Sequence, residues 1–322
     1  MKHCFVLNPA AGNGKAQVAL LPRILAAVKE AGVDYEIHRT VNTGDACLRV
    51  WAHCEREPQV RKRFYACGGD GTLSEALNGL YGFENAELAS VPIGTGNDFV
   101  RNFGGKEGFL DIAAQIAGAA VPIDVMRYEI SAGEDAGGLA AQGYAINMFN
   151  MGFDADVVAR TARLKKNPLL NGTAAYAAGV ATELIRLRAI RARISIDGGE
   201  AIDTDILLSG VANGRYSGGG FDGIPSARVN DGLLDVAVIT PLSRREFIQL
   251  IGKYHDGTHV DDPRMQSYMS LRRCREALYT PAGGMTLSID GEARRVSAPV
   301  RFSVASERVS FALPRGVKLA AE

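Results

Sequence analysis

The sequence predicts an α/β domain followed by a β-rich domain. Up to about residue 120, strand-like and helix-like segments alternate and glycine-rich turns follow three of the strands, whereas short β-type runs take over afterwards. Repeated β-α-β units indicate a parallel sheet with helices on both faces. With 322 residues, the chain is long enough for two cores. We place the domains at 1–122 and 123–305, and expect the tail, about 306–322, to pack back on the first domain.

Hydrophobic periodicity defines the elements of the first half. Short apolar runs predict strands, and apolar residues at helical spacing predict helices. The strands are expected at 2–7, 35–39, 61–67 and 88–93, and the helices at 14–31, 45–57, 72–81 and after the turn "GTGNDFVRNFG". Ligands of parallel sheets gather at the carboxyl ends of the strands. The turns "NPAAGNGK", "GGDGT" and "GTGND" should therefore share one sheet edge.

The second half is punctuated by Gly, Pro and Asp, and predicts an antiparallel β domain. Its strands are expected at 123–130, 144–149, 193–197, 206–211, 234–240, 285–289 and 300–305. Two helical insertions are expected at 154–191, with a break near Asn167-Pro168, and at 243–254. The segment 131–143, "SAGEDAGGLAAQG", predicts a flexible hairpin connection.

Composition and charge exclude several classes of protein. The 36 basic and 36 acidic residues cancel, so we expect no nucleic-acid partner. The N-terminal apolar run is too short for a signal peptide, and no stretch approaches the ~18 apolar residues of a membrane span, so we expect a cytoplasmic location. Five cysteines without a C-x-x-C pair indicate reduced thiols rather than a disulfide framework or a zinc knuckle.

The stretch "FYACGGDGTLSEALNGL" leads from an apolar strand into a helix through Gly68, Gly69 and Gly71. Glycines let the backbone expose N–H groups where a helix begins, and such groups bind phosphate. Asp70 lies among them, and a carboxylate beside phosphate is repulsive unless a cation or a transferable proton lies between the two. The stretch therefore predicts phosphate and metal together, and Asp70 is the best candidate to hold Mg²⁺.

Two further turns point to the same edge. The turn "NPAAGNGK" fits neither the P-loop pattern nor G-x-G-x-x-G, and a tight strand-to-helix turn explains it equally well. The turn "PIGTGNDF" offers the Thr95 hydroxyl, the Asn97 amide and the Asp98 carboxylate at a helix start, with an ordinary N-cap as the alternative. Two glycine turns on one sheet edge favour a ligand site.

Motifs of the second half also have ordinary structural explanations. Asp290-Gly291 in "SIDGEARRV" is typical of a hairpin turn. Asp231-Gly232 in "RVNDGLLDVAVI" predicts another turn, with a metal site as the alternative. The glycines of "ANGRYSGGGFDGIPSA" indicate close approach of the backbone to another group.

Histidines and basic clusters complete the candidates. His255 and His259 have a metal-like spacing, but Gly257 between them weakens a helix and disfavours a zinc site. The clusters "ARLKK", "RLRAIRAR" and "LRRCR" indicate solvated faces, with contact to an anionic lipid surface as the alternative.

The motifs together resemble those of the diacylglycerol kinase catalytic family, in its soluble bacterial lipid-kinase branch. From about residue 3 to 295, the family's order is kept by "NPAAGNGK", "GGDGTLSEALNGL", "PIGTGNDFVRNFG", "NMGFDADVV", "NGRYSGGG", "PSARVNDGLLDV" and "IDGE". The motif "GGDGT" alone is shared with NAD kinases and 6-phosphofructokinases, whereas "GTGNDF" joined to a distal "DGE" is more selective.

The resemblance implies an N-terminal three-layer nucleotide-binding domain similar to NAD kinase and phosphofructokinase, a C-terminal β-sandwich, and a cleft where ATP meets a lipid hydroxyl. It implies that the nucleotide contacts are Asn8, Thr40, Gly68, Gly69, Asp70, Gly71, Thr72, Ser74, Thr95 and Asn97. It also implies a structural Mg²⁺ on Asp231, with main-chain oxygens near Arg228 and Leu233. Ser74 stands where the family usually has Asn, which leaves one polar contact open.

Phosphoryl transfer needs phosphates held by backbone donors, a divalent cation, and a base near the acceptor hydroxyl. The resemblance implies that Asp290 and Glu292 face the acceptor, and the sequence leaves Asp290, Glu292 and Asp70 open as the base. The expected reaction transfers the γ-phosphate of ATP, with Mg²⁺, to diacylglycerol or a related lipid at the inner membrane face. The rivals are a kinase of a soluble acceptor, similar to NAD kinase, and a nucleotide- or lipid-binding regulator without turnover. The acceptor lipid and the oligomeric state, a homodimer included, stay open.

Overall fold

The computed structural model describes residues 1–132, 141–165 and 172–319. The chain forms two compact units. Unit 1 comprises Met1–Val125 together with the C-terminal segment from Ser306, and unit 2 comprises Met126–Ala305. Most of the predicted hairpin connection at 131–143, and the predicted helix break at Asn167-Pro168, lie outside the described residues.

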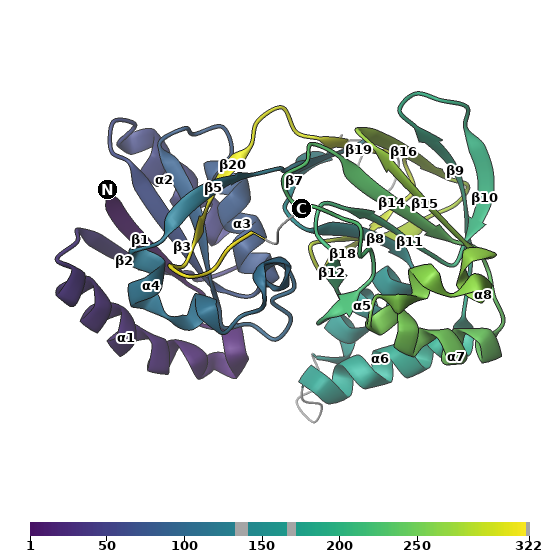
Figure 1. Cartoon of the computed structure of the whole chain (residues 1–322), viewed down its shortest axis with the longest axis horizontal. Coiled ribbons are helices and arrows are strands. Elements are labelled where there is room, and N and C mark those ends of the chain that lie inside the picture. Colours follow the sequence, from purple (N-terminus) through teal and green to yellow (C-terminus); the bar gives the residue numbers. More distant parts are fainter. Residues whose placement is uncertain (133–140, 166–171, 320–322) are drawn as a thin grey trace. The chain divides into compact units, whose positions relative to one another are not determined.

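Unit 1 is built on a six-stranded sheet in the order β2-β1-β3-β4-β20-β5 (Figure 1). Its strands are β1 (Lys2–Leu7), β2 (Tyr35–Arg39), β3 (Lys62–Gly68), β4 (Ala86–Pro92), β5 (Ala119–Ile123) and β20 (Val309–Leu313). Strands β2, β1, β3, β4 and β20 are parallel, and β5 is antiparallel to β20. The predicted parallel sheet of β-α-β units is confirmed.

Helices cover both faces of this sheet. They are η1 (Ala11–Gly14), α1 (Ala16–Ala31), α2 (Asp45–Arg56), α3 (Asp70–Leu80), η2 (Phe99–Phe103), η3 (Gly108–Leu110) and α4 (Ile112–Ile116). Successive residues of a strand point to opposite faces. Tyr65 packs in the cluster that includes α1 and α4, whereas the neighbouring Phe64 meets His53 of α2. Unit 1 therefore has three layers, as the sequence predicts.

The C-terminal strand β20 lies between β4 and β5, in the interior of the sheet. Phe311 is fully buried there, and its ring centroid lies 5.1 Å from that of Phe99 and 5.5 Å from that of Phe103. Next to this strand, Arg308 Nε donates to the buried carboxylate of Asp124 at 2.7 Å. These contacts join the last strand to unit 1.

Three predicted strands are wrong in the same way, because each apolar run passes from one sheet to another. The run at 123–130 ends β5 of unit 1 and then forms β6 (Met126–Ile130) of unit 2. The run at 144–149 divides between β7 (Ala141–Ala145) and β8 (Met148–Gly152). The run at 206–211 divides between β10 (Ile202–Ile206) and β11 (Leu208–Ala212). Apolar patterning reports burial, and burial continues through a corner where hydrogen-bond pairing changes.

Unit 2 consists of two antiparallel six-stranded sheets, ordered β10-β9-β16-β19-β6-β7 and β15-β14-β11-β8-β17-β18, and a two-stranded ribbon of β12 and β13. The strands not yet defined are β9 (Ile190–Ile196), β12 (Tyr216–Ser217), β13 (Phe221–Asp222), β14 (Leu234–Ile239), β15 (Met269–Cys274), β16 (Glu276–Pro281), β17 (Met285–Ile289), β18 (Glu292–Val296) and β19 (Val300–Val304).

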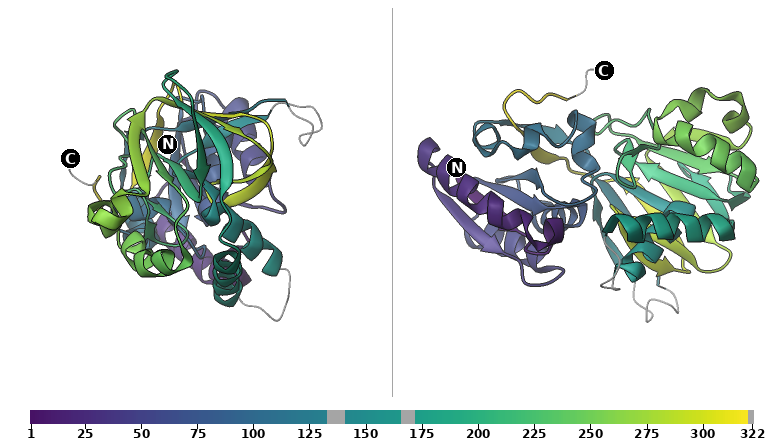
Figure 2. Two further views of the ribbon diagram at one scale, coloured as in Figure 1. Left: turned by 90° about the vertical axis from the view of Figure 1, so that its right-hand side faces the viewer. Right: turned by 90° about the horizontal axis from the view of Figure 1, so that it is seen from below.

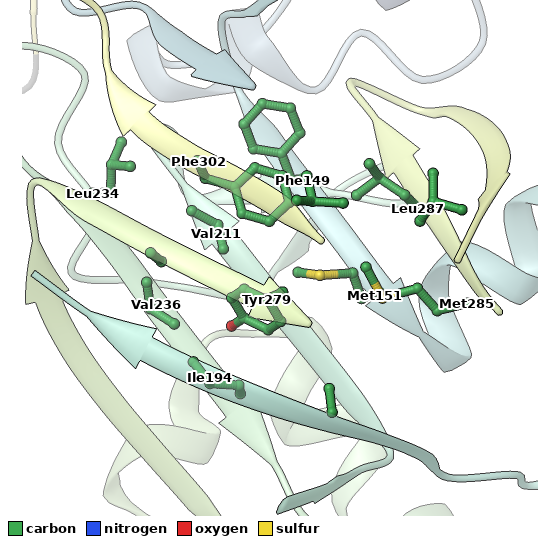
Figure 3. Close-up of a cluster of buried hydrophobic side chains, with 14 of the residues drawn as sticks. Phe149, Met151, Ile194, Val211, Leu234, Val236, Tyr279, Met285, Leu287 and Phe302 are labelled. Carbon is green, nitrogen blue, oxygen red and sulfur yellow. The ribbon is translucent and has the colours of Figure 1, made fainter. Parts of the chain in front are cut away.

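The core of unit 2 lies between the inner faces of these two sheets (Figure 3). Phe149 and Leu287 come from one sheet, and Tyr279 and Phe302 come from the other. The rings of Phe149 and Phe302 lie 4.6 Å apart, and the buried Tyr279 hydroxyl is satisfied by a 2.8 Å hydrogen bond with Ser209. The predicted antiparallel β-sandwich is confirmed.

Helices of unit 2 pack beside the sandwich, and they are α5 (Phe153–Leu164), α6 (Gly172–Arg186), α7 (Arg244–His255), η5 (Thr258–Asp261) and α8 (Pro263–Gln266). Figure 2 shows α5 and α6 side by side, and α5 lies along β8, β17 and β18. Helix α7 begins with a capping box between Ser243 and Glu246 and buries Phe247 and Leu250. None of the helices in the described part of the chain is long and apolar enough to cross a membrane.

Candidate active site

The predicted nucleotide residues follow four adjacent parallel strands. Strands β2, β1, β3 and β4 are neighbours in the sheet, so the turns after them lie along one edge. From one end of this edge to the other, the turns bring Thr40, Asn8, Gly68 and Gly94. The prediction that the three glycine-rich turns share one sheet edge is confirmed.

Asn8 joins the first of these turns to the second. Its Nδ2 donates to Thr72 Oγ1 at 3.0 Å, and its Oδ1 accepts the N–H of Ala10 at 2.9 Å. Beside it, the Thr40 N–H and hydroxyl both donate to the Leu7 carbonyl, at 2.9 and 3.4 Å. The hydrogen bonds show that Asn8 and Thr40 shape this part of the edge.

The turn "GGDGT" has no room for a side chain at its first position. A Cβ added to Gly68 would lie 2.1 Å from Thr72 Oγ1, far inside van der Waals contact. Gly69 is the N-cap residue of α3, and Asp70 is the first residue of the helix. The first N–H groups of a helix have no partners inside it and carry partial positive charge. The N-terminus of α3, which includes Gly71 and the half-buried Ser74 one turn on, is therefore suited to an anion.

Asp70 ties this turn to the next one. Its Oδ1 accepts the N–H of Asp98 at 2.9 Å and of Phe99 at 3.4 Å, so the carboxylate holds the start of η2. A Cβ added to Gly96 would lie 2.9 Å from Asp70 Oδ2. Asp70 therefore has a positioning role that the sequence did not indicate.

The turn "GTGND" is held by its own asparagine. Asn97 adopts a left-handed backbone with φ of 55°, donates from Nδ2 to the Gly94 carbonyl at 2.7 Å and accepts the Gly94 N–H at 3.2 Å. A Cβ on Gly94 would lie 2.4 Å from the Gly69 Cα, so the two glycine turns touch. The Asn97 amide thus shapes the turn, whereas Thr95 is exposed.

In unit 2, Asp290 and Gly291 form the two-residue turn between β17 and β18, with φ of 46° and 88° and with Ile289 opposite Glu292. The hairpin interpretation is therefore right. The Asp290 side chain is nevertheless buried, and its carboxylate accepts three main-chain N–H groups at 2.9 to 3.0 Å.

The three donors are Ile146, Asn147 and Met148, which lead into β8. The three hydrogen bonds engage both carboxylate oxygens and tie the hairpin turn to the start of β8. Glu292, two residues on, is exposed. The two acidic residues of "DGE" therefore have different surroundings.

Asn147 and Asn213 reinforce this loop and were missed by sequence reasoning. Asn213 is fully buried and donates to the Ile146 carbonyl at 2.8 Å, while Asn147 donates to the Tyr216 carbonyl at 2.7 Å. The signal that could have found them is the glycine-rich stretch "ANGRYSGGG", because buried amides commonly hold such irregular backbone. The close backbone approach expected for that stretch is thus found in part, because Asn213 and Tyr216 of the stretch contact residues 146 and 147 of the same unit.

Asp231, the residue predicted to hold a structural Mg²⁺, contacts an arginine. Asp231 Oδ1 accepts the Leu233 N–H at 3.1 Å, and its Oδ2 pairs with the Arg273 guanidinium. Arg228 donates to the carbonyls of residues 225, 226 and 227 at 3.0 to 3.3 Å. Carboxylate and carbonyl oxygens suit Mg²⁺, but an ion on Asp231 would have to displace Arg273. This metal site stays a prediction.

The disfavoured zinc alternative fails on geometry. His259 is fully buried with its ring centroid 4.7 Å from that of Tyr254, whereas His255 is exposed and pairs with Asp256 at 2.7 Å. The nearby carboxylate of Asp262 contacts Lys253 and Arg264. These histidines do not converge on a shared point.

Comparison with known proteins decides the family. Residues 2–128 match the family model described as "Diacylglycerol kinase catalytic domain", and residues 147–313 match "YegS C-terminal NAD kinase beta sandwich-like domain". The chain is 32% identical to the "Probable lipid kinase YegS-like" of Pseudomonas aeruginosa, over 97% of this chain and 94% of that protein. The chain belongs to the diacylglycerol kinase catalytic family.

Other relatives of this diacylglycerol kinase family member agree. It is 30% identical to the "Diacylglycerol kinase" of Mycobacterium tuberculosis, over 79% of this chain and 78% of that one. A crystal structure titled as a putative diacylglycerol kinase from Bacillus anthracis has the same fold, with a TM-score of 0.69, 22% identity, and coverage of 98% and 96%. Family membership makes the protein a phosphotransferase with an alcohol group as acceptor, as the resemblance implied.

Proposed function

We propose that this lipid kinase transfers the γ-phosphate of ATP, with Mg²⁺, to the hydroxyl of diacylglycerol or a related lipid. The observation that carries the proposal is the contact between the two glycine turns after β3 and β4, beside the N-terminus of α3. Phosphoryl transfer requires positioned backbone donors for the phosphates, and this edge offers them where a helix dipole favours negative charge.

On this proposal, the N–H groups of Gly69, Gly71 and Thr72 face the phosphates. Ser74 and Thr95 offer hydroxyl groups to the nucleotide, since Ser74 is half-buried on α3 and Thr95 is exposed. The other predicted contacts, Asn8, Thr40, Gly68 and Asn97, act through the shape that their hydrogen bonds and close packing give the turns.

Asp70 fits a role in holding the catalytic Mg²⁺. A carboxylate at the phosphate-binding end of α3 is repelled by phosphate unless a cation lies between them, and Mg²⁺ prefers carboxylate oxygens. When bound, Mg²⁺ would neutralise the charge that develops on the transferring phosphoryl group. Asp70 Oδ1 also accepts two main-chain N–H groups, so the carboxylate would hold the ion from a fixed position.

Glu292 is our assignment for the base that accepts the proton of the lipid hydroxyl. It is exposed at the first position of β18, whereas the Asp290 oxygens accept three backbone N–H groups. Asp290 then serves as a positioning residue that fixes the hairpin from which Glu292 projects.

A patch on unit 2 supports contact with an anionic membrane. The α6–α7 patch consists of exposed Ile185, Arg188, Arg244, Arg245 and Ile248. Arg244 donates to the Ile185 carbonyl at 2.6 Å, and Ile248 follows Arg244 by one helical turn, so the patch is continuous. Exposed isoleucines among arginines suit a bilayer surface with anionic headgroups. By contrast, the basic cluster at 186–193 is partly neutralised, because Arg191 and Arg193 pair with Asp205 and Asp203.

The experiment that tests the proposal measures transfer of labelled γ-phosphate from ATP, with Mg²⁺, to a panel of lipids in mixed micelles and to NAD. The variants are Asp70→Asn and Glu292→Gln, and Glu200→Gln is the matched control, because Glu200 is an exposed glutamate on the same unit as Glu292. Loss of a general base costs about 10² to 10⁴ in rate. We expect label in one lipid class, a rate of transfer at least about 10²-fold lower in Glu292→Gln, and an unchanged rate in the control.

Other outcomes would overturn the proposal in distinct ways. Label in NAD alone would make the protein a kinase of a soluble acceptor. Binding of ATP with no label in any acceptor would favour a regulator without turnover. Full activity of Glu292→Gln would remove Glu292 as the base while leaving the lipid kinase intact.

A further inference from the structure

Away from the candidate active site, three metal-ligating side chains come together in unit 1. Glu36 and His38 lie on β2, the edge strand of the sheet, and His53 lies on α2. Their ligand atoms are all within 4.8 Å of one another. Within 1–132, 141–165 and 172–319, His, Cys, Asp and Glu side chains form no other such group of three or more.

The spacing matches the edges of a metal coordination sphere. Glu36 Oε2 lies 3.2 Å from His38 Nε2 and 3.5 Å from His53 Nε2. In a tetrahedral zinc site with bonds of about 2.0 to 2.1 Å, neighbouring ligand atoms are about 3.3 Å apart. Residues two apart on a strand share a face, and here that face is the one covered by α2. Little movement is needed to place an ion between the three side chains.

We propose that Glu36, His38 and His53 bind a divalent metal ion of the zinc class. Two imidazoles and one carboxylate are a donor set that zinc accepts, and the fourth position would be taken by water. The inference goes beyond the proposed kinase reaction and does not depend on it.

The surroundings supply supporting contacts. Lys2 Nζ pairs with Glu36 Oε1, which leaves Oε2 directed at the two histidines. The edge of Phe64 borders His53, whose side chain is only 7% exposed. Glu36 and His38 are 31% and 23% exposed, so an ion can enter from the sheet edge.

Two positively charged side chains lie beside the proposed site and would lower its affinity for a metal ion. Lys2 contacts the glutamate, and Arg56 Nη2 lies 3.3 Å from His53 Nδ1. A metal-bound neutral His53 carries its proton on Nδ1, so Arg56 would have to turn away from this atom. Arg56 is exposed and can do so. The alternative is a purely hydrogen-bonded cluster, in which Glu36 Oε2 accepts an N–H hydrogen bond from each histidine.

Binding at this place would join β2 to α2. Thr40 follows His38 by two residues, and the segment from Thr40 to α2 is already closed by the Val41 N–H, which donates to Asp45 at 3.0 Å. An ion would therefore fix the strand end that carries Thr40. Its direct consequence would be a more stable unit 1.

The test uses the full chain, freed of any histidine tag and treated with a chelator, and titrates it with Co²⁺ as the spectroscopic stand-in for Zn²⁺. Visible absorption reports tetrahedral cobalt, and the fluorescence of Trp51, the one tryptophan of the chain, reports α2 two residues from His53. The variants are His38→Gln and Arg56→Gln, and His255→Gln is the matched control, because His255 is exposed on unit 2.

We expect one equivalent of Co²⁺ with tetrahedral absorption and competition by Zn²⁺. His38→Gln should weaken binding by more than about tenfold, since loss of an outer-shell partner alone costs about that much. Arg56→Gln should tighten binding, and His255→Gln should leave it unchanged. No tetrahedral band in the native chain, or equal binding by native protein and His38→Gln, would show that the cluster is only hydrogen-bonded. Circular dichroism of each variant checks that the fold is kept.

Discussion

Replacing Asp290 by Asn separates its positioning role from a role as base. The aspartate Oδ1 accepts the N–H groups of Asn147 and Met148, and Oδ2 accepts that of Ile146. Asparagine keeps one carbonyl oxygen but replaces the other oxygen by NH₂, so a donor then faces one of the N–H groups. Asparagine also tolerates the left-handed backbone at φ of 46°, so the change isolates the side chain.

The cost can be worked out from these three bonds. Hydrogen bonds to a charged group contribute about 1.5 to 3 kcal/mol each and neutral ones about 0.5 to 1.5, so two bonds lose about 1 kcal/mol each. The third leaves a buried N–H unsatisfied, which costs about 1 to 3 kcal/mol. The free energy of unfolding of unit 2 should therefore fall by about 3 to 5 kcal/mol. Glu292→Gln, at an exposed position, should change it by about 0.5 kcal/mol or less.

Urea unfolding measures both effects. Far-UV circular dichroism follows the whole chain, whereas Trp51 lies in unit 1 and its fluorescence follows that unit. Asp290→Asn should move the dichroism transition of unit 2 to lower urea. If Asp290→Asn unfolds as the native chain does and yet abolishes phosphoryl transfer, the three hydrogen bonds do not define its role. Asp290 would then return as the candidate base.

Three further predictions concern the glycine turns, the membrane patch and pH. Gly94→Ala places a Cβ 2.4 Å from the Gly69 Cα and should weaken ATP binding, measured by calorimetry, by at least about tenfold. Gly252→Ala is the control, because a Cβ there would have no atom within 4 Å and should leave ATP binding unchanged. Equal affinities of the two variants would contradict the contact argument. Ile248→Glu should reduce sedimentation with phosphatidylglycerol vesicles more than Ile202→Glu, an isoleucine of similar exposure on β10, and equal losses would refute the α6–α7 patch. Burial raises the pKa of Asp154 from 3.8 to about 7, so its native state holds a proton that the unfolded state loses, and stability falls as pH rises from about 4 to 7. This pKa difference corresponds to a loss of stability of at most about 4 kcal/mol, and to about 2 kcal/mol because the side chain is partly exposed. Asp154→Asn should remove this dependence of stability on pH in urea unfolding, and an unchanged dependence would contradict the assignment.

Sequence reasoning succeeded where a local signal is enough. The strands β1, β2 and β17 were predicted with the bounds observed, because each is a short strand-like segment between turn residues. The shared edge of the glycine turns followed from parallel topology alone. The edge strand β15 was missed, because the arginines of "LRRCR" point to solvent and hide its β character.

Long-range contacts were beyond the sequence. The donors to Asp290 lie more than 140 residues earlier in the chain, so nothing near "DGE" shows that its first carboxylate is already engaged. The Glu36, His38 and His53 cluster was missed for a related reason. Two of its ligands alternate on a strand and the third lies on the next helix, whereas His255 and His259 drew attention through spacing alone.

The two aspartates Asp70 and Asp290 share a property that limits what mutagenesis can show. Asp70 and Asp290 each accept main-chain N–H groups, so each carboxylate holds a loop in place besides any chemistry that it performs. Loss of activity on replacing either one therefore mixes chemistry with loop geometry. Glu292 is exposed at a strand start, and its replacement leaves the hairpin hydrogen bonds of Asp290 intact. A large loss of rate in Glu292→Gln with unchanged unfolding would thus assign a chemical step more directly than any change at Asp70 or Asp290.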